Sequence, residues 1–103
     1  MNPNRGLDPL DVDPDRYKVL FENDRVRVLE FRDQPGEKVG MHGHPDRLIY
    51  SFGPWKRKFW YPDGRTEVVE GKAGDVKWSN ALEHAGENVG STETHNLFIE
   101  FKR

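Results

Sequence analysis

Three histidines carry the chemistry that this sequence most readily suggests. His42 and His44 stand on either side of Gly43, and His84 follows forty residues after His44. Side chains at positions i and i+2 of a β-strand point to the same face, so an extended segment directs His42 and His44 at one point. If a second strand brings His84 to that point, three neutral imidazoles can bind one metal ion.

The donor set narrows the choice of metal. Imidazole suits the divalent first-row metals iron, zinc, nickel, manganese and copper. Three protein ligands leave coordination positions open, as a catalytic metal requires, whereas structural sites are usually closed. An isolated His-x-His pair is also compatible with two solvated loop histidines, so the spacing alone leaves both interpretations open.

Composition bounds the class of protein. A chain of 103 residues predicts one domain, and with 34% hydrophobic against 33% charged residues the apolar side chains must gather on one side of each element. The absence of cysteine excludes disulfides and thiolate ligands. The net charge of −2, with interspersed signs, argues against a nucleic-acid partner. A polar N-terminus and the lack of a long apolar run predict a cytoplasmic protein that does not bind membranes.

The order of the segments predicts an N-terminal arm followed by one β domain. Residues 1–16 contain three prolines and four aspartates, and we expect an extended arm there, packed over its own domain or a neighbour's. Residues 17–103 form the domain, and Asp63-Gly64 predicts a hairpin turn within it. Expected strands, from their β-branched and aromatic residues, are Tyr17–Phe21, Arg25–Arg32, Leu48–Phe52, Trp55–Tyr61, Thr66–Glu70, Asp75–Trp78 and Glu93–Lys102, besides the histidine segment. Many short strands with no helical period predict an all-β sandwich or barrel.

Two motifs resemble those of the cupin family. Gly36, then five residues, then His42-Gly43-His44 looks like the first half of the first cupin motif, and His84, three residues, then Asn88 looks like the end of the second. The resemblance implies a jelly-roll barrel of the double-stranded β-helix type, with a metal inside it on His42, His44 and His84. It is strongest to short single-domain bacterial cupins with a His-x-His-Pro segment, and it also implies a homodimer.

The departures from the family pattern concern the fourth ligand. The family has a glutamate separated from the second histidine by three or four intervening residues, and at those positions this chain has Leu48 and Ile49. In the second motif Ser79 and Ala81 replace a proline and a glycine. The resemblance then implies a three-histidine site, as in the cupin thiol and diketone dioxygenases, or a site that has lost its metal. With no carboxylate ligand, the metal keeps its full charge and favours an anionic or chelating substrate.

Residues around the histidines are candidates for substrate binding. Strand alternation from His44 predicts that Tyr50 and Phe52 point inward, provided that no bulge intervenes, and Trp78 precedes His84 closely. Alternation in the last strand places His95 on one face with Leu97, Ile99 and Phe101, and that face is expected to point into the barrel. Aromatic residues at these positions can equally be core filling.

The functional hypothesis is a small-molecule metalloenzyme of the dioxygenase type, with iron as the expected metal. The alternative is a cupin module that binds or senses a small ligand without catalysis, since a fold does not by itself assign a function.

Overall fold

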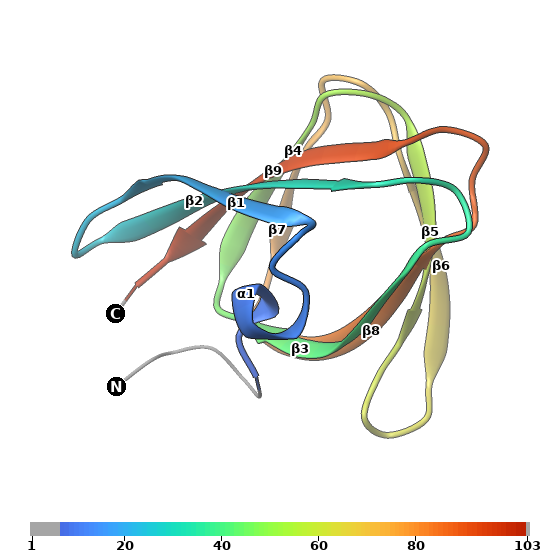
Figure 1. The fold of residues 1–103 in the computed structure, drawn as a ribbon, viewed down its shortest axis with the longest axis horizontal. Coiled ribbons are helices and arrows are strands. Elements are labelled where there is room, and N and C mark those ends of the chain that lie inside the picture. The colour runs from blue at the N-terminus through green and yellow to red at the C-terminus, as the bar shows by residue number, and fades with distance from the viewer. Residues whose placement is uncertain (1–6, 103) are drawn as a thin grey trace.

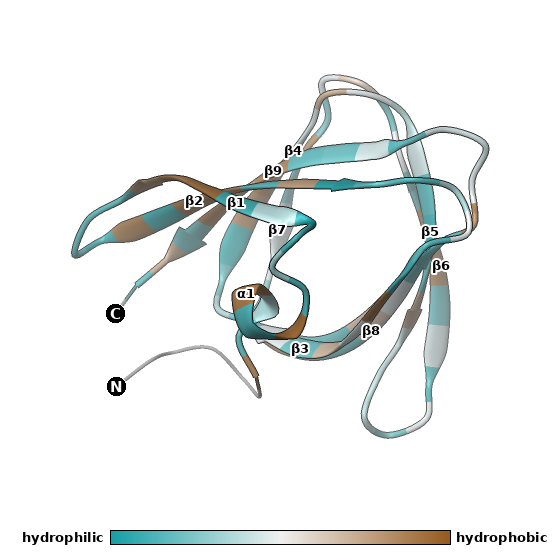
Figure 2. Ribbon diagram, viewed as in Figure 1, coloured by the Kyte–Doolittle hydropathy of each residue, from teal (hydrophilic) through white to brown (hydrophobic). Residues whose placement is uncertain are grey.

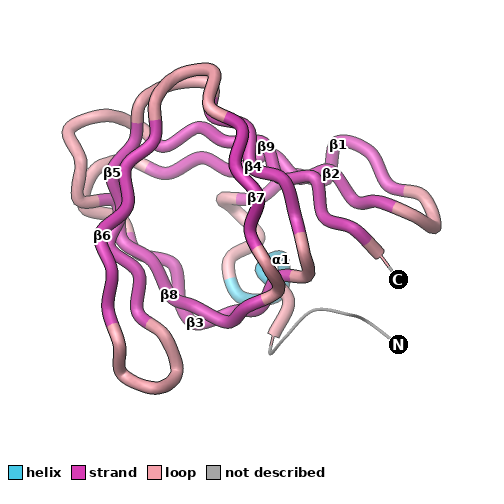
Figure 3. Tube along the Cα trace, turned by 180° about the vertical axis from the view of Figure 1, so that it is seen from behind, coloured by secondary structure: helices cyan, strands magenta, loops and turns pink. Residues whose placement is uncertain are grey.

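The computed structural model describes residues 7–102, and within them the chain forms two antiparallel β-sheets and one helical turn. One sheet has the strand order β1-β2-β9-β4-β7, and the other has the order β3-β8-β5-β6. The elements are α1 (Pro9–Val12), β1 (Tyr17–Glu22), β2 (Val26–Asp33), β3 (Lys38–His44), β4 (Arg47–Ser51), β5 (Trp55–Trp60), β6 (Thr66–Gly71), β7 (Val76–Ser79), β8 (Leu82–Asn88) and β9 (Thr94–Phe101). Seen from behind, the two sheets curve round to face each other, and β1 with the start of β2 extends to one side (Figure 3). The predicted all-β barrel is thereby confirmed.

The turns follow the residues that the sequence marks for them. Gly64 has a φ of +88°, and the β5–β6 hairpin closes with the Gly64 amide donating to the Tyr61 carbonyl at 2.9 Å. An L-residue with a side chain rarely adopts that φ, so the Asp63-Gly64 pair fixes the hairpin at this place. Gly36 and Gly74, each with a φ of +86°, turn the chain before β3 and before β7.

The N-terminal segment differs from its prediction. Residues 9–12 form one turn of helix in place of a fully extended arm. Asp8 caps this turn by accepting a hydrogen bond from the Leu10 amide, and Pro9 stands at the first helical position, where its missing N–H costs nothing. The turn packs beside β3 of its own domain, as Figure 1 shows. Residues 1–6 lie outside the described residues.

The apolar core lies between the sheets. Phe31 of β2 and Phe98 of β9 stack with ring centroids 5.9 Å apart, and Tyr17 packs against both. Val39 and Leu29 complete the buried cluster. In Figure 2 the colour changes repeatedly between hydrophobic and hydrophilic along β2, as expected for a strand whose two faces differ.

Within residues 7–102, no helix has the length and hydropathy needed to cross a lipid bilayer.

Candidate metal centre

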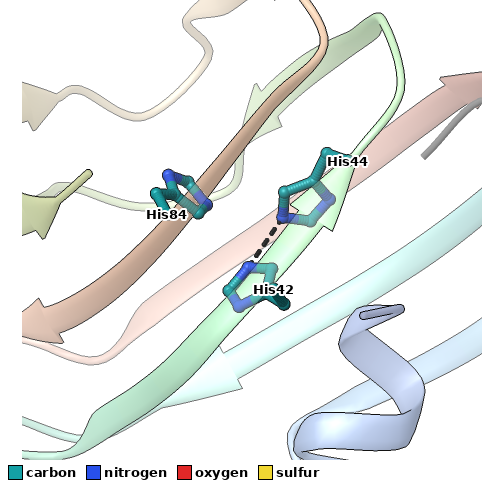
Figure 4. A group of neighbouring side chains, drawn as sticks. All are labelled: His42, His44 and His84. Carbon is teal, nitrogen blue, oxygen red and sulfur yellow. Dashed lines mark hydrogen bonds between the residues drawn. The ribbon is translucent and has the colours of Figure 1, made fainter. Parts of the chain in front are cut away.

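The three histidines converge inside the barrel. His42 and His44 lie on β3, and His84 lies directly opposite His42 on the neighbouring antiparallel strand β8 (Figure 4). The ring centroids are 4.7 Å apart for His42 and His44, 4.9 Å for His42 and His84, and 5.3 Å for His44 and His84. One ligand nitrogen from each ring lies within 4.8 Å of the others, and all three side chains are buried. The predicted convergence is confirmed.

A β-bulge aims His42 at this point. Val39 pairs with Gly86 and His42 pairs with His84, so β3 has one more residue than β8 between the two pairs. A bulge reverses the alternation, and both Val39 and His42 therefore point inward. It also presents the Gly40 carbonyl to the imidazole, 2.7 Å from His42 Nδ1.

Two acceptors define the tautomers of the first two rings. His42 Nδ1 faces the Gly40 carbonyl, and His44 Nδ1 lies 2.9 Å from a carboxylate oxygen of Glu100. Each acceptor requires a proton on Nδ1, which leaves a lone pair on each Nε2. The two Nε2 atoms are only 2.9 Å apart (Figure 4). Two facing lone pairs at that distance repel each other unless a proton or a metal cation lies between them, so this donor set fits a metal ion.

The third ring is held by stacking. His84 is parallel to Phe59 of β5, with an angle of 1° between the planes and centroids 4.7 Å apart. No side-chain hydrogen bond to His84 occurs among residues 7–102. Packing therefore fixes the plane of this imidazole and leaves its nitrogens available as ligands.

Burial keeps all three imidazoles neutral. Burial is the main reason that the pKa of His42 falls to about 4; the bond to the Gly40 carbonyl opposes this shift, and the positive charge of Arg47 contributes to it. Burial, with Arg47 as the next cause, also holds the pKa of His44 and of His84 well below the usual value. Only neutral imidazole binds metal, so no proton competes at neutral pH.

A chain of ion pairs, buried at Glu100 and partly buried at Arg27 and Asp8, supports His44 on the side away from the other histidines. The Glu100 carboxylate that faces His44 also accepts from Arg27 Nε at 2.9 Å, and Arg27 in turn lies 2.7 Å from Asp8. Burial raises the pKa of Glu100, and Arg27 opposes that rise. Asp8 caps α1, so the helical turn is connected through two charged residues to a candidate metal ligand.

No carboxylate stands where the family pattern has one. Leu48 faces outward opposite Trp78, and Ile49 lines the cavity beside the histidines. The described lining of that cavity contains no aspartate or glutamate. The open positions of a bound metal would therefore face neutral or cationic groups.

The cavity contains a charged residue that the sequence analysis did not select. Arg47 begins β4 and is 4% exposed, and its guanidinium carbon lies 4.4 Å from the centroid of the Phe98 ring. The sequence analysis extended strand alternation from His44 and therefore placed Arg47 on the outer face. That extension ignored the break at Pro45 and Asp46, where the chain passes from one sheet to the other. After that break, Arg47, Ile49 and Ser51 occupy the inner face.

The four predicted substrate-binding residues lie elsewhere, and the expectation that Tyr50, Phe52 and His95 point inward is wrong. None of them lines the cavity. Phe52 and Trp78 are 46% and 55% exposed, and Tyr50 contacts Phe52 on the outer side of the sheet. His95 stacks on Phe52 and bonds Glu30 at 2.7 Å, also outside. In β9 the buried positions are Thr94, Asn96, Phe98 and Glu100, the opposite parity to the one predicted.

Several solved structures superimpose on this chain, and they identify the class of its fold. A cupin domain from Bordetella pertussis superimposes with a TM-score of 0.76 at 27% identity, over 84% of this chain and 92% of that chain. A predicted oxalate decarboxylase from Thermotoga maritima matches at 0.58 and 24% identity, over 84% and 79% of the two chains. A polyketide cyclase from Streptomyces resistomycificus matches at 0.60 and 21% identity, over 84% and 64%.

The chain therefore has the cupin fold, the double-stranded β-helix that its motifs predict. No family model matches the sequence, and a search of curated proteins gives no match.

Proposed function

We propose that this protein is a metal-dependent enzyme that oxidises a small anionic or chelating substrate with dioxygen. The observation that carries the proposal is the set of three buried, neutral imidazoles whose ligand atoms converge beside a cavity without acidic residues. His42, His44 and His84 would hold the metal, with iron as the expected ion. When bound, iron would supply open coordination positions and one-electron redox chemistry.

The residues of the chain have separate parts in this proposal. Glu100 and the Gly40 carbonyl keep the Nδ1 protons of His44 and His42 in place, so that both Nε2 atoms are directed at the metal. Tyr17 places its hydroxyl 3.5 Å from His42 Nε2, and burial raises the pKa of that hydroxyl, which keeps it protonated and able to donate. The apolar walls from Phe31, Phe59 and Phe98 limit access of water.

The size of the cavity favours a second candidate. The space open to water-sized molecules is about 40 Å³, whereas sites for drug-sized ligands are roughly 300–1,000 Å³. A site this small also suits a module that binds or senses a small ligand without turning it over. The enzyme requires the metal, whereas the binding module works with or without it, and the two candidates differ in turnover.

Oxygen consumption separates the two candidates. Metal-free protein is reloaded anaerobically with Fe²⁺, and oxygen uptake is followed with thiols, diketones and short organic acids as trial substrates. Uptake coupled to loss of one substrate, absent from His84→Ala, supports the enzyme. Tight metal binding with no substrate-dependent uptake throughout the panel supports the binding module.

A further inference from the structure

Arg47 is a buried cation whose hydrogen-bonding groups are not satisfied. Its Nε and Nη1 are buried and have no hydrogen-bond partner. No ion pair to Arg47 is formed within the part of the chain that the structure describes. Its contact with the Phe98 ring recovers part of the lost hydration as a cation–π interaction, but it leaves the N–H groups unpaired. An unpaired buried charge is costly and rarely kept without a function.

Two other arginines, the buried Arg57 and the partly buried Arg27, show what Arg47 lacks. Arg57 bonds Asp33 at 2.7 Å, and Arg27 bonds both Asp8 and Glu100 at 2.7 Å. Glu100 is the register partner of Arg47 across β4 and β9, yet its two oxygens face Arg27 and His44. The fold thus neutralises the guanidinium groups of Arg57 and Arg27 and leaves that of Arg47, which lines the cavity, without a counter-charge.

Arg47 shares its cavity with the three histidines. It lines the same space as His42, His44 and His84, and no acidic side chain lines that space. A divalent metal on three neutral imidazoles would add two positive charges beside the guanidinium. Such a site attracts an anion that contacts both centres.

The size of the cavity limits that anion. About 40 Å³ is open to water-sized molecules, and one water needs roughly 10–15 Å³ on that measure. The space therefore admits only a few non-hydrogen atoms besides a metal ion. A carboxylate is small, planar and matched to a pair of parallel N–H groups on one edge of a guanidinium, either Nε with Nη2 or Nη1 with Nη2. The unpaired Nε and Nη1 of Arg47 belong one to each of these edges.

We propose that Arg47 binds the carboxylate group of a small organic acid, with the acid lying between the guanidinium and the three histidines. This specifies the substrate class of the proposed function and rests on that function for the metal. It makes Arg47 a specificity-determining residue, and the histidines would hold the metal that contacts the same acid.

The test uses Arg47→Met, which keeps the length and apolar stem of the side chain and removes the charge. Replacing an unpaired buried ion by an apolar residue is usually tolerated, and circular dichroism checks the fold. Arg65→Met, at an exposed arginine of the β5–β6 hairpin, is the matched control. Acetate, oxalate and the neutral analogues acetamide and oxamide are titrated calorimetrically into metal-free and metal-loaded protein, and metal content is measured separately.

We expect wild type and Arg65→Met to bind at least one of the two acids, and Arg47→Met to bind it at least tenfold more weakly at equal metal content. Arg47→Lys should lose part of this affinity, because lysine keeps the charge without the planar pair of donors, and it serves in place of Arg47→Met if that variant does not fold. Equal affinity in wild type and the Arg47 variants, equal affinity for acids and amides, or no binding of either acid to wild type would overturn the proposal. If wild type binds no metal, the proposed function is contradicted. The role of Arg47 is still supported in that case if metal-free wild type binds the acid and metal-free Arg47→Met does not.

Discussion

His44 Nδ1 and Glu100 Oε2 lie 2.9 Å apart, and this buried contact joins β3 of one sheet to β9 of the other. Both side chains are almost fully buried, at 1% and 2% exposure. The contact sets the ring orientation and tautomer of a candidate metal ligand, and it is the only direct bond from a carboxylate to the three histidines within residues 7–102.

Replacing Glu100 by glutamine should weaken metal binding without removing a ligand. The amide no longer provides a charged acceptor for the His44 Nδ1 proton, and loss of such a partner typically costs about 10–100-fold in metal affinity. Competition with a chromophoric chelator measures the change. The control is Glu30→Gln, which alters the similar pair between Glu30 and His95 on the outside of the barrel. Equal metal affinity in the two variants would contradict the assigned role of Glu100.

The metal-free protein should lose stability as the pH falls from 6.5 towards 4. Burial lowers the pKa of His42 to about 4 from the ordinary 6.5, and the pKa values of His44 and His84 shift in the same direction. Between these values the unfolded chain takes up protons that the folded chain refuses, so the free energy of unfolding decreases with decreasing pH. For His42 alone the full loss is about 3 kcal/mol, at about 1.4 kcal/mol for each pKa unit.

Denaturant unfolding of metal-free wild type and His42→Leu at several pH values measures this effect. The variant should lose less stability than wild type over the same interval, because one titrating group is gone. Identical pH dependence in the two proteins would show that His42 does not titrate as its burial requires.

We predict that the outer face of the five-stranded sheet mediates a homodimer. Trp78 of β7, which is 55% exposed, stacks on Phe101 of β9, and Val76 of β7 and Phe52, directly after β4, are also exposed. Contiguous exposed apolar surface of this kind often marks an interface. Light scattering after size-exclusion chromatography should give a dimer for wild type and a monomer for Trp78→Lys. Val68→Lys, at a position of equal exposure on β6 of the other sheet, should remain dimeric. A monomeric wild type at high concentration would refute the prediction.

Strand positions could be predicted from the sequence, but not which face of each strand points inward. Turn residues such as Asp63-Gly64 fix where strands end, and the predicted strands agree with the structure to within a residue or two. In β9 the residues alternate between the two faces as predicted, but the set predicted to point inward points outward. The inner positions include Thr94, Asn96 and Glu100, whereas the apolar Leu97 and Ile99 face outward. Hydrophobicity misleads here because the barrel interior buries polar groups and the outer sheet face carries apolar ones.

The part of the site that the motifs contain, the three histidines, could be predicted from the sequence. The His-x-His pair and His84 follow directly from side-chain alternation and the cupin-like spacing. Glu100 and Arg47 were missed because their roles depend on contacts between strands distant in sequence. The break at Pro45 also resets the alternation, and only the three-dimensional path of β4 shows that Arg47 points inward.

Metal content tests the central claim most directly. Protein purified without a chelating tag is dialysed with Fe²⁺ under anaerobic conditions and analysed for metal, alongside His42→Ala, His84→Ala and His95→Ala. We expect about one metal ion per chain in wild type and His95→Ala, and almost none in the other two variants, which should also lack the thermal stabilisation that bound metal gives wild type. Equal metal content in all four proteins, or no metal in any of them, would contradict a metal centre on these three histidines.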